Sequence, residues 1–300
     1  MLLRRTRGQV QVGLRRPVVM AASPAVARTF DEASGQIIRA ADAALADALE
    51  TRALVVPSGV SAVLRPAVGD AASRAAARDR AASVSRHGHQ AEASRYRRLR
   101  PVSVLVHGAA GSDIADEVDR LLRSAGGAGL APAVLGEAAA QGPVLIASDG
   151  EPPRAWSDAL VRAETPHLYL RAVESAVLLG PWVEPGVTGC LRCDDLGRAA
   201  ADPAWPLLVQ QASARGAHER RDGVPSPIDA LSLASAAAMA ARDLVRDAEG
   251  LLPDLWSTEL RWGPPSHLED PAGADQSEHG ARFIDRHAAC GCICWGEAWQ

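Results

Sequence analysis

The chain lacks two amino acids altogether. None of its 300 residues is lysine or asparagine, so all 32 basic side chains are arginine. GC-rich codon usage is one explanation for these absences. The absence of lysine also excludes a Schiff-base lysine, a phosphate-loop lysine and a kinase-type nucleotide lysine. Any activity of this protein has to operate without a lysine amine.

A strongly basic charge and long apolar runs are also missing. A net charge of −4 and a pI of about 6.1 give no basic field of the kind that nucleic-acid binding uses. No stretch approaches the roughly 20 apolar residues of a membrane-spanning helix. Residues 1–27 loosely imitate a secretory signal, but Ser23 and Pro24 break the apolar part, which fits a strand and a helix better. We expect a cytoplasmic protein without nucleic-acid or membrane partners.

The rest of the composition is typical of a globular protein. Apolar residues make up 47% and charged residues 23% of the chain, which is long enough to bury a core without disulfide bonds. We therefore expect one or two domains. In a reducing compartment the five cysteines are metal ligands or bystanders rather than disulfide partners.

The first part of the chain has the pattern of a small α+β unit. Residues 9–20 alternate or cluster apolar side chains as short strands do, and Ser23-Pro24 opens a helical stretch. A second helical pattern covers residues 37–49, and residues 52–56 form a strand pattern. Together they predict a winged-helix-like unit over residues 1–60.

Residues 61–100 form a connection between two units. From Asp70 onward they are polar and rich in alanine and arginine, which is typical of a linker or a solvated helix. His87 and His89 lie close together there, and a metal site is the alternative interpretation of that pair.

From residue 102 the pattern becomes strand, turn and helix in alternation. A strand at 102–106, a glycine turn at Gly108–Gly111 and an amphipathic helix at 114–122 form the first such unit. This alternation predicts a mostly parallel sheet with helices on both faces over residues 101–296. The further elements expected are strands at 130–135, 144–149 and 168–170 and a helix at 156–163.

Three further segments complete this domain. Residues 210–227 are polar and predict a long surface crossing. Ser226 and Asp229 are candidate caps for a helix over 230–248, and residues 255–262 alternate as a strand does.

The most specific motif is a pair of cysteine pairs. Cys190 and Cys193 are three residues apart, and Cys290 and Cys292 follow about a hundred residues later in glycine-containing sequence. Four thiolates satisfy the tetrahedral preference of zinc and leave no position for water, which predicts a structural rather than a catalytic metal. Cys294 and His287 are spare donors for which a core or surface role is expected.

The glycine turn is a degraded form of a nucleotide-binding motif. A G-x-G-x-x-G turn brings backbone N–H groups to phosphate, but the three positions here are Gly108, Ala110 and Asp113. Gly111 partly re-forms the turn, whereas a carboxylate at Asp113 repels phosphate.

Asp149 follows a buried strand at the position where open α/β sheets contact ligands. A magnesium or nucleotide contact and a turn or helix-cap role are both open for it. Gly108, Gly111 and Asp149 therefore define a degenerate site at which ATP and magnesium binding is in doubt. Arg154, Arg162 and Arg171 lie in the same region and look like ordinary solvated arginines.

These residues together resemble the ThiF-like superfamily of ubiquitin-activating-type enzymes. Three segments are similar to its subgroup of bacteriocin-type cyclodehydratase partners, the leader-peptide-binding proteins of thiazole/oxazole-modified microcin pathways. The segments are residues 177–198, 202–206 and 287–292. The resemblance implies a ThiF-like Rossmann-type domain with zinc on the two cysteine pairs and a winged-helix leader-recognition unit before it. A homodimer is a further possibility that the superfamily implies.

The resemblance leaves two functions open. Adenylating relatives use lysine and asparagine around ATP, and of their phosphate-site residues only Asp149 has a plausible match. The first hypothesis is therefore a binding protein that holds a precursor leader peptide for a separate YcaO-type cyclodehydratase. The second is an ATP-dependent enzyme that adenylates a peptide or carrier-protein C-terminus. Codon usage alone would not remove a residue that catalysis required, which favours the first.

Overall fold

The computed structural model divides the chain into two compact units, residues 1–97 and 98–300. The residues that it describes are 2–5, 8–12, 18–21, 49, 69–70, 73–74, 77–78, 80–82, 84, 101–125, 127–138, 142–216, 226–263 and 279–292.

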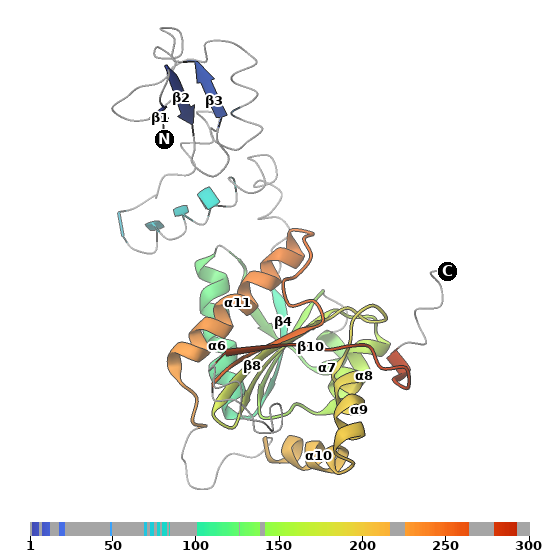
Figure 1. Ribbon diagram of the computed structural model, residues 1–300. Helices are drawn as coiled ribbons and strands as arrows, with labels where there is room; N and C mark the ends of the chain where they lie inside the picture. The colour runs from blue at the N-terminus through green and yellow to red at the C-terminus, as the bar shows by residue number, and fades with distance from the viewer. Residues whose placement is uncertain are drawn as a thin grey trace. The chain divides into compact units, whose positions relative to one another are not determined.

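The first unit contains a three-stranded antiparallel sheet (Figure 1). Its strands, in spatial order, are β1 (Leu2–Arg5), β2 (Gln9–Val12) and β3 (Val18–Ala21). The central strand β2 buries Val10 and Val12 on one face, as its alternating sequence predicts. The strands expected within residues 9–20 are confirmed. The sequence analysis missed β1, because residues 1–7 look like the charged start of a signal segment.

The connecting segment is helical where the structure describes it. The described residues from Ser73 to Val84 have helical conformation, and Ala77 and Val84 are buried. The solvated-helix interpretation is therefore the better one for these residues. His87, His89 and the elements expected between residues 23 and 56, apart from the helical Leu49, lie outside the described residues. The winged-helix unit stays a prediction.

The second unit is built on a seven-stranded mixed sheet (Figure 1). In spatial order the strands are β10 (His279–Phe283), β9 (Thr258–Trp262), β8 (Ala176–Val183), β7 (His167–Val173), β6 (Val144–Asp149), β4 (Val102–His107) and β5 (Leu130–Pro132). The pairings among β5, β4, β6 and β7 are parallel, and those among β7, β8, β9 and β10 are antiparallel. The expected parallel half is present, and an antiparallel meander extends it.

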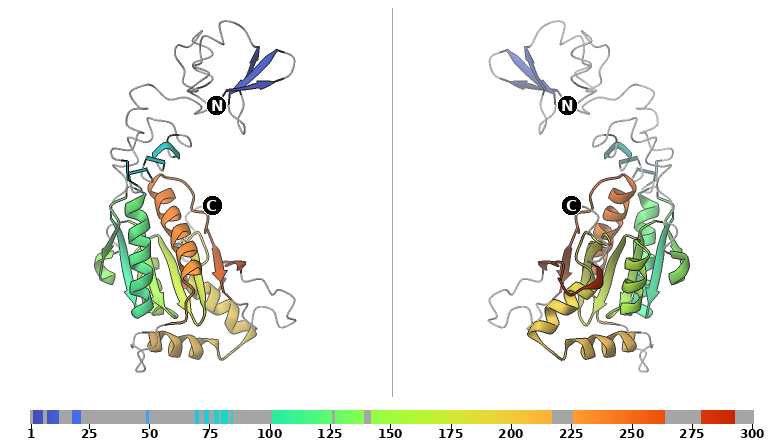
Figure 2. Two further views of the ribbon diagram at one scale, coloured as in Figure 1. Left: turned by 90° about the vertical axis from the view of Figure 1, so that its left-hand side faces the viewer. Right: turned by 90° about the vertical axis from the view of Figure 1, so that its right-hand side faces the viewer.

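Helices cover both faces of this sheet (Figures 1 and 2). On one face, α6 (Ala109–Ser124) and α11 (Ala230–Ala248) pack side by side and bury apolar residues such as Ile114 and Leu244. On the other face, α7 (Leu135–Ala138), α8 (Arg154–Arg162) and α9 (Leu191–Ala201) bury residues such as Leu160 and Leu191. None of the described helices combines the length and apolarity needed to cross a bilayer.

The last helix on this side corrects one prediction. Residues 210–227 were expected to form a polar crossing, but α10 (Trp205–Gly216) continues through Gln210 to Gly216. Pro206 looks like a helix stop in the sequence, yet it occupies the first turn, where the missing N–H costs nothing. Residues 217–225 lie outside the described residues.

The helix over 230–248 is confirmed at both ends. Asp229 caps it by accepting a hydrogen bond from the Ser232 N–H at 2.7 Å, and Gly250 follows its end with a positive φ of 74°. Ser226, the other candidate cap, makes a different contact that closes the candidate nucleotide site.

Candidate functional site

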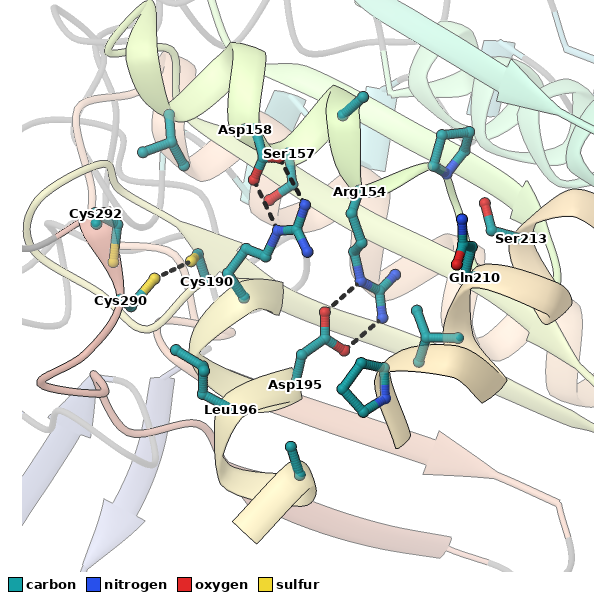
Figure 3. Close-up of a pocket in the computed structure, with 18 of the residues that line it drawn as sticks. Arg154, Ser157, Asp158, Cys190, Asp195, Leu196, Gln210, Ser213, Cys290 and Cys292 are labelled. Carbon is teal, nitrogen blue, oxygen red and sulfur yellow. Dashed lines mark hydrogen bonds and ion pairs between the residues drawn. The ribbon is translucent and has the colours of Figure 1, made fainter. Parts of the chain in front are cut away.

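The four paired cysteines come together in one buried cluster, seen in part in Figure 3. The Sγ atom of Cys190 lies 3.8 Å from that of Cys193 and 3.7 Å from that of Cys290, and the Cys193 and Cys292 Sγ atoms are 3.4 Å apart. Zinc–sulfur bonds of about 2.3 Å place the sulfurs of a tetrahedral site about 3.8 Å apart. The donor set and its spacing therefore fit a tetrahedral metal ion such as zinc.

Helix α9 and a close backbone contact position the cluster. Cys190 is the N-cap of α9, and Cys193 lies one turn later on the same face. Gly189 allows the second pair to approach, because a Cβ at this position would collide with the carbonyl oxygen of Ile284. The segment from Ile284 then continues to Cys290 and Cys292.

The electrostatics of the cluster also favour a cation. Hydrogen bonds from Cys190 and then Cys292 lower the pKa of the Cys193 thiol, since they stabilise its thiolate. Hydrogen bonds with Cys193 and then Cys292, followed by burial, raise the pKa of Cys190. Four sulfurs this close cannot all be thiolates without a positive charge between them, and a divalent metal supplies that charge.

His287, one of the two spare donors, contacts backbone atoms of its own turn. The backbone N–H of Ala289 donates to Nδ1 of His287 at 3.1 Å, and the N–H of Cys290 donates to the His287 carbonyl at 2.8 Å. His287 thus shapes the turn that leads into the second cysteine pair. Cys294 lies outside the described residues.

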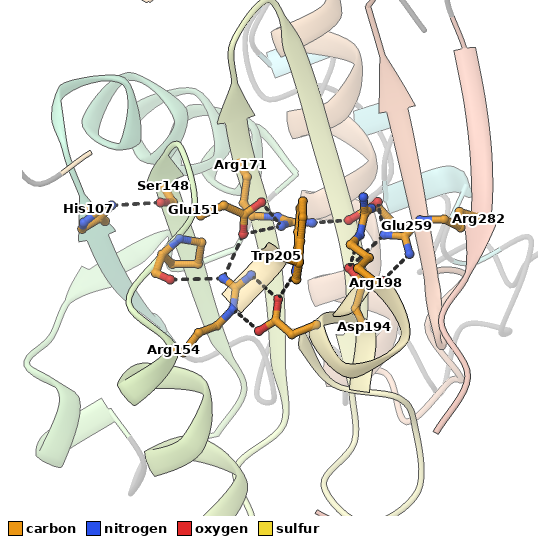
Figure 4. A network of polar contacts seen from close by, with 12 residues as sticks. His107, Ser148, Glu151, Arg154, Arg171, Asp194, Arg198, Trp205, Glu259 and Arg282 are labelled. Atoms are coloured by element: carbon orange, nitrogen blue, oxygen red, sulfur yellow. Dashed lines mark hydrogen bonds and ion pairs between the residues drawn. The ribbon is translucent and has the colours of Figure 1, made fainter. Parts of the chain in front are cut away.

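A closed ring of polar contacts links the cysteine helix α9 to five other elements, namely α8, α10, β7, β9 and β10 (Figure 4). We call it the ion-pair ring. Its members are, in order of contact, Asp195, Arg154, Glu151, Arg171, Glu259, Arg282, Asp194, Arg198 and Trp205. Arg154 contacts Asp195 through two nitrogens at 2.7 and 2.9 Å. The Trp205 indole closes the ring by donating to Asp195 at 3.0 Å beneath the Arg198 guanidinium.

The ring is electrically balanced, with four arginines against four carboxylates, and it is buried except at Arg198, Arg282 and Trp205, which are partly exposed. The side chains of Arg171 and Glu259 are only 3% and 4% exposed. Burial alone would raise the pKa of Glu151, but Arg171 and Arg154 hold it below its usual value. Because every charge has a partner, the ring avoids the desolvation penalty of an orphaned buried ion.

The candidate nucleotide crevice lies between the carboxyl ends of β4 and β6, where the strand order reverses. The protein's own groups occupy it. Asp149 accepts a hydrogen bond from the Ala110 N–H at 3.2 Å, so its carboxylate fills the N-terminus of α6. The Ser226 hydroxyl donates to the other carboxylate oxygen at 2.9 Å. Asp149 therefore contacts the start of α6, and its role toward a nucleotide stays a prediction.

The two glycines of this turn have different roles. Gly108 has a positive φ of 73° at the start of α6. A Cβ at Gly111 would lie 2.7 Å from the Ala147 carbonyl oxygen, so Gly111 permits close packing of α6 on β6. The G-x-G-x-x-G spacing places its third glycine at Asp113, which is instead exposed on the helix. Helix packing is therefore one reason for a glycine at position 111.

His107 lies beside this crevice at the end of β4. Its Nδ1 is 3.1 Å from the Ser148 hydroxyl, and its ring packs edge-on against Trp156. Burial lowers the pKa of His107. Helix α10 also lies near the carboxyl end of β6. A Cβ atom placed on Gly150, the residue after β6, would lie 3.9 Å from the carbonyl oxygen of Ala212 on α10.

A cleft of about 900 Å³ lies between α8, α9, α10 and the Cys290–Cys292 turn (Figure 3). It is separate from the filled crevice. Arg154 and Arg162 both line it, but only Arg162 is solvent-exposed. Arg154 and Arg171 are buried members of the ion-pair ring, so the expectation that they are solvated is wrong.

Comparisons with known proteins place this architecture among solved structures. No protein-family model matches the chain, and no curated protein matches it. The heterocyclase TruD superposes with a TM-score of 0.55 at 17% identity, covering 98% of this chain and 41% of TruD. A heterocyclase in complex with substrate and cofactor gives 0.54 at 18% identity, covering 98% and 38%. The chain thus spans about two fifths of these heterocyclases.

A second kind of neighbour matches over its whole length. E. coli MccB, solved with selenomethionine-containing MccA, superposes with a TM-score of 0.55 at 13% identity, covering 98% of this chain and 97% of MccB. At such identities the likeness shows the fold. The chain therefore shares an α/β fold with these heterocyclases and with MccB.

Proposed function

We propose that the protein binds the leader segment of a ribosomally made, azole-modified peptide and presents it to a separate YcaO-type cyclodehydratase. The crevice between β4 and β6 carries this proposal. Asp149 and Ser226 fill the place where an adenylating enzyme would hold phosphate, and a carboxylate at that place repels it. The chain also has no lysine to offset that charge.

The extent of the structural matches supports a partner role. The chain covers nearly the whole of MccB, which was solved with the peptide MccA, but only about two fifths of each heterocyclase. If this chain serves the same chemistry as the heterocyclases, a second polypeptide has to supply what their remaining length contributes. The proposed cyclodehydratase is that second polypeptide.

The leader would add as a strand to the outer edge of β3, which pairs only with β2 among the described strands. Of the two edges of the first sheet, β1 (Leu2–Arg5) carries two arginines, whereas β3 (Val18–Ala21) has no charged residue. Charged side chains protect an edge from pairing, and an uncharged edge accepts an extended peptide. Val19 on β3 is 41% exposed and is available to contact such a peptide.

Zinc would act structurally in this proposal. Cys190, Cys193, Cys290 and Cys292 would fill all four of its positions and so hold the start of α9 against the segment that follows β10. With no open position, the metal offers no site for a reacting water.

The proposal is tested by titrating the full-length protein into a fluorescein-labelled precursor peptide encoded beside a cyclodehydratase gene. We expect saturable binding that Val19→Glu weakens at least tenfold, because a charge on β3 blocks strand addition. Val187→Glu is the matched control, since Val187 is an exposed valine of the second unit. Failure of the wild-type protein to bind any such precursor would contradict the proposal.

The adenylating function is retained as the alternative because the chain matches MccB along its whole length and keeps Gly108 and Gly111. ATP–pyrophosphate exchange with the precursor peptide present distinguishes the two functions. We expect no exchange above background. Robust exchange that depends on the peptide would establish the alternative.

A further inference from the structure

The cleft of about 900 Å³ beside the cysteine cluster has no role in leader binding on β3 or in metal binding. Its size is that of a ligand pocket, for which about 300–1,000 Å³ is typical. Apolar side chains from three helices line it, namely Val161 of α8, Leu196 of α9 and Val209 of α10. It can therefore take apolar groups of a ligand.

Most of the charges in the cleft already have partners. Arg154 is paired with Asp195, and Arg192 makes two contacts with Asp158 at 2.8 and 3.0 Å. Arg162 is the exception, because no described acidic side chain pairs with it and it is solvent-exposed. The lining thus presents one arginine without a described acidic partner next to an apolar surface.

We propose that this cleft binds a second segment of the precursor, a short apolar peptide stretch with one acidic side chain near Arg162. This inference rests on the proposed function and specifies where the peptide continues after the leader. An apolar stretch matches Val161, Leu196 and Val209, and an acidic residue balances Arg162.

A nucleotide fits the cleft less well than a peptide does. Phosphate groups need several free donors or cations, but the guanidinium groups of Arg154 and Arg192 are committed to carboxylates. Asp158 and Asp195 would in addition face a nucleotide's phosphates with like charge. One acidic side chain needs only the single charge of Arg162.

Two substitutions on neighbouring positions of α9 test the cleft. Ala199 lines it, whereas the adjacent Ala200 is exposed outside it, so Ala199→Trp fills the cleft and Ala200→Trp is the matched control. Arg162→Glu tests the charge, with Arg242→Glu as its control because Arg242 lies on α11 in an exposed pair. Each full-length variant is titrated with the complete precursor and with a leader-only peptide.

We expect Ala199→Trp and Arg162→Glu each to weaken binding of the complete precursor about tenfold and to leave leader-only binding within twofold. The control variants should change neither affinity. If wild-type protein binds both peptides and all variants bind the complete precursor equally, the cleft inference is overturned and the proposed function stands. If wild-type protein binds neither peptide, both are overturned. A loss of cyclodehydratase docking with unchanged precursor affinity would assign the cleft to the enzyme and also overturn the inference.

Discussion

The Asp149 carboxylate lies 3.2 Å from the backbone nitrogen of Ala110, and that contact places a negative charge at the N-terminus of α6. The first turn of a helix attracts anions through its free N–H groups and its dipole. Here an aspartate from the neighbouring strand β6 satisfies that preference. A carboxylate of the protein itself therefore lies at the first turn of α6.

Replacement of Asp149 should therefore affect stability rather than activity. We expect Asp149→Ala to lower the free energy of unfolding by about 1–2 kcal/mol, since a helix cap contributes about that much. Urea unfolding measures this change, and Asp229→Ala, which removes the cap of α11, should cost a similar amount. Precursor affinity should stay unchanged. A nucleotide role for Asp149 would instead show as ATP–pyrophosphate exchange that the substitution abolishes.

Removal of a cysteine ligand should release a metal ion. We expect purified protein to contain one zinc per chain by elemental analysis and Cys193→Ser to lose it. Unfolding should become easier by several kcal/mol, because structural zinc contributes about 10 kcal/mol or more to such folds. Cys294→Ser is the control and should keep the zinc. Zinc retained in Cys193→Ser at wild-type stoichiometry would exclude Cys193 as a ligand.

The ion-pair ring should be intolerant of single substitutions. Arg171→Leu leaves Glu151 and Glu259 buried without their shared cation, and we expect a loss of about 3–5 kcal/mol in the free energy of unfolding. Arg123→Leu breaks an exposed pair with Asp119 and should cost at most about 1 kcal/mol. Chemical denaturation of both variants provides the comparison. Equal costs would mean that burial adds nothing to the contribution of the ring.

A buried histidine should make stability depend on pH. Burial lowers the pKa of His167 to about 4, although its Nδ1 lies 2.9 Å from the Thr165 carbonyl. The unfolded chain has the ordinary value of about 6.5, so between these values it binds a proton that the folded chain does not. Stability should therefore fall by about 3 kcal/mol as the pH drops from 6.5 towards 4.

The His167→Gln variant isolates this contribution. We expect it to remove the part of the pH dependence that His167 causes, as measured by urea unfolding at several pH values between 7 and 4.5. Parallel stability curves for wild type and His167→Gln would show that this histidine does not titrate in that range.

The cysteine cluster could be found from sequence because the residue type itself carries the chemistry. Two tight pairs of thiols with this spacing are typical of a metal site, and the long separation between Cys190 and Cys290 does not obscure that pattern. The central strands could also be predicted from the sequence. Residues 144–147 are apolar because β6 is buried on both faces, and such runs have few alternative interpretations.

The ion-pair ring could not be found in the same way. Arg171 pairs with Glu151 at a separation of 20 residues and with Glu259 at 88, and no local pattern connects such positions. Arginine is also the only strongly basic residue in this chain, so a buried arginine looks like any solvated one. Only the tertiary arrangement shows that Arg154 and Arg171 are interior.

The order of synthesis gives the last strand a special position. Cys190 meets Cys290 across 100 residues, Cys193 meets Cys292 across 99, and Asp194 meets Arg282 across 88. A ribosome delivers α9 long before any of these partners. Until β10 and the turn after it emerge, the thiols lack their counterparts and the ring stays open. One short stretch, which forms the sheet edge and the turn after it, therefore supplies both the second thiol pair and the Arg282 side chain of the ring.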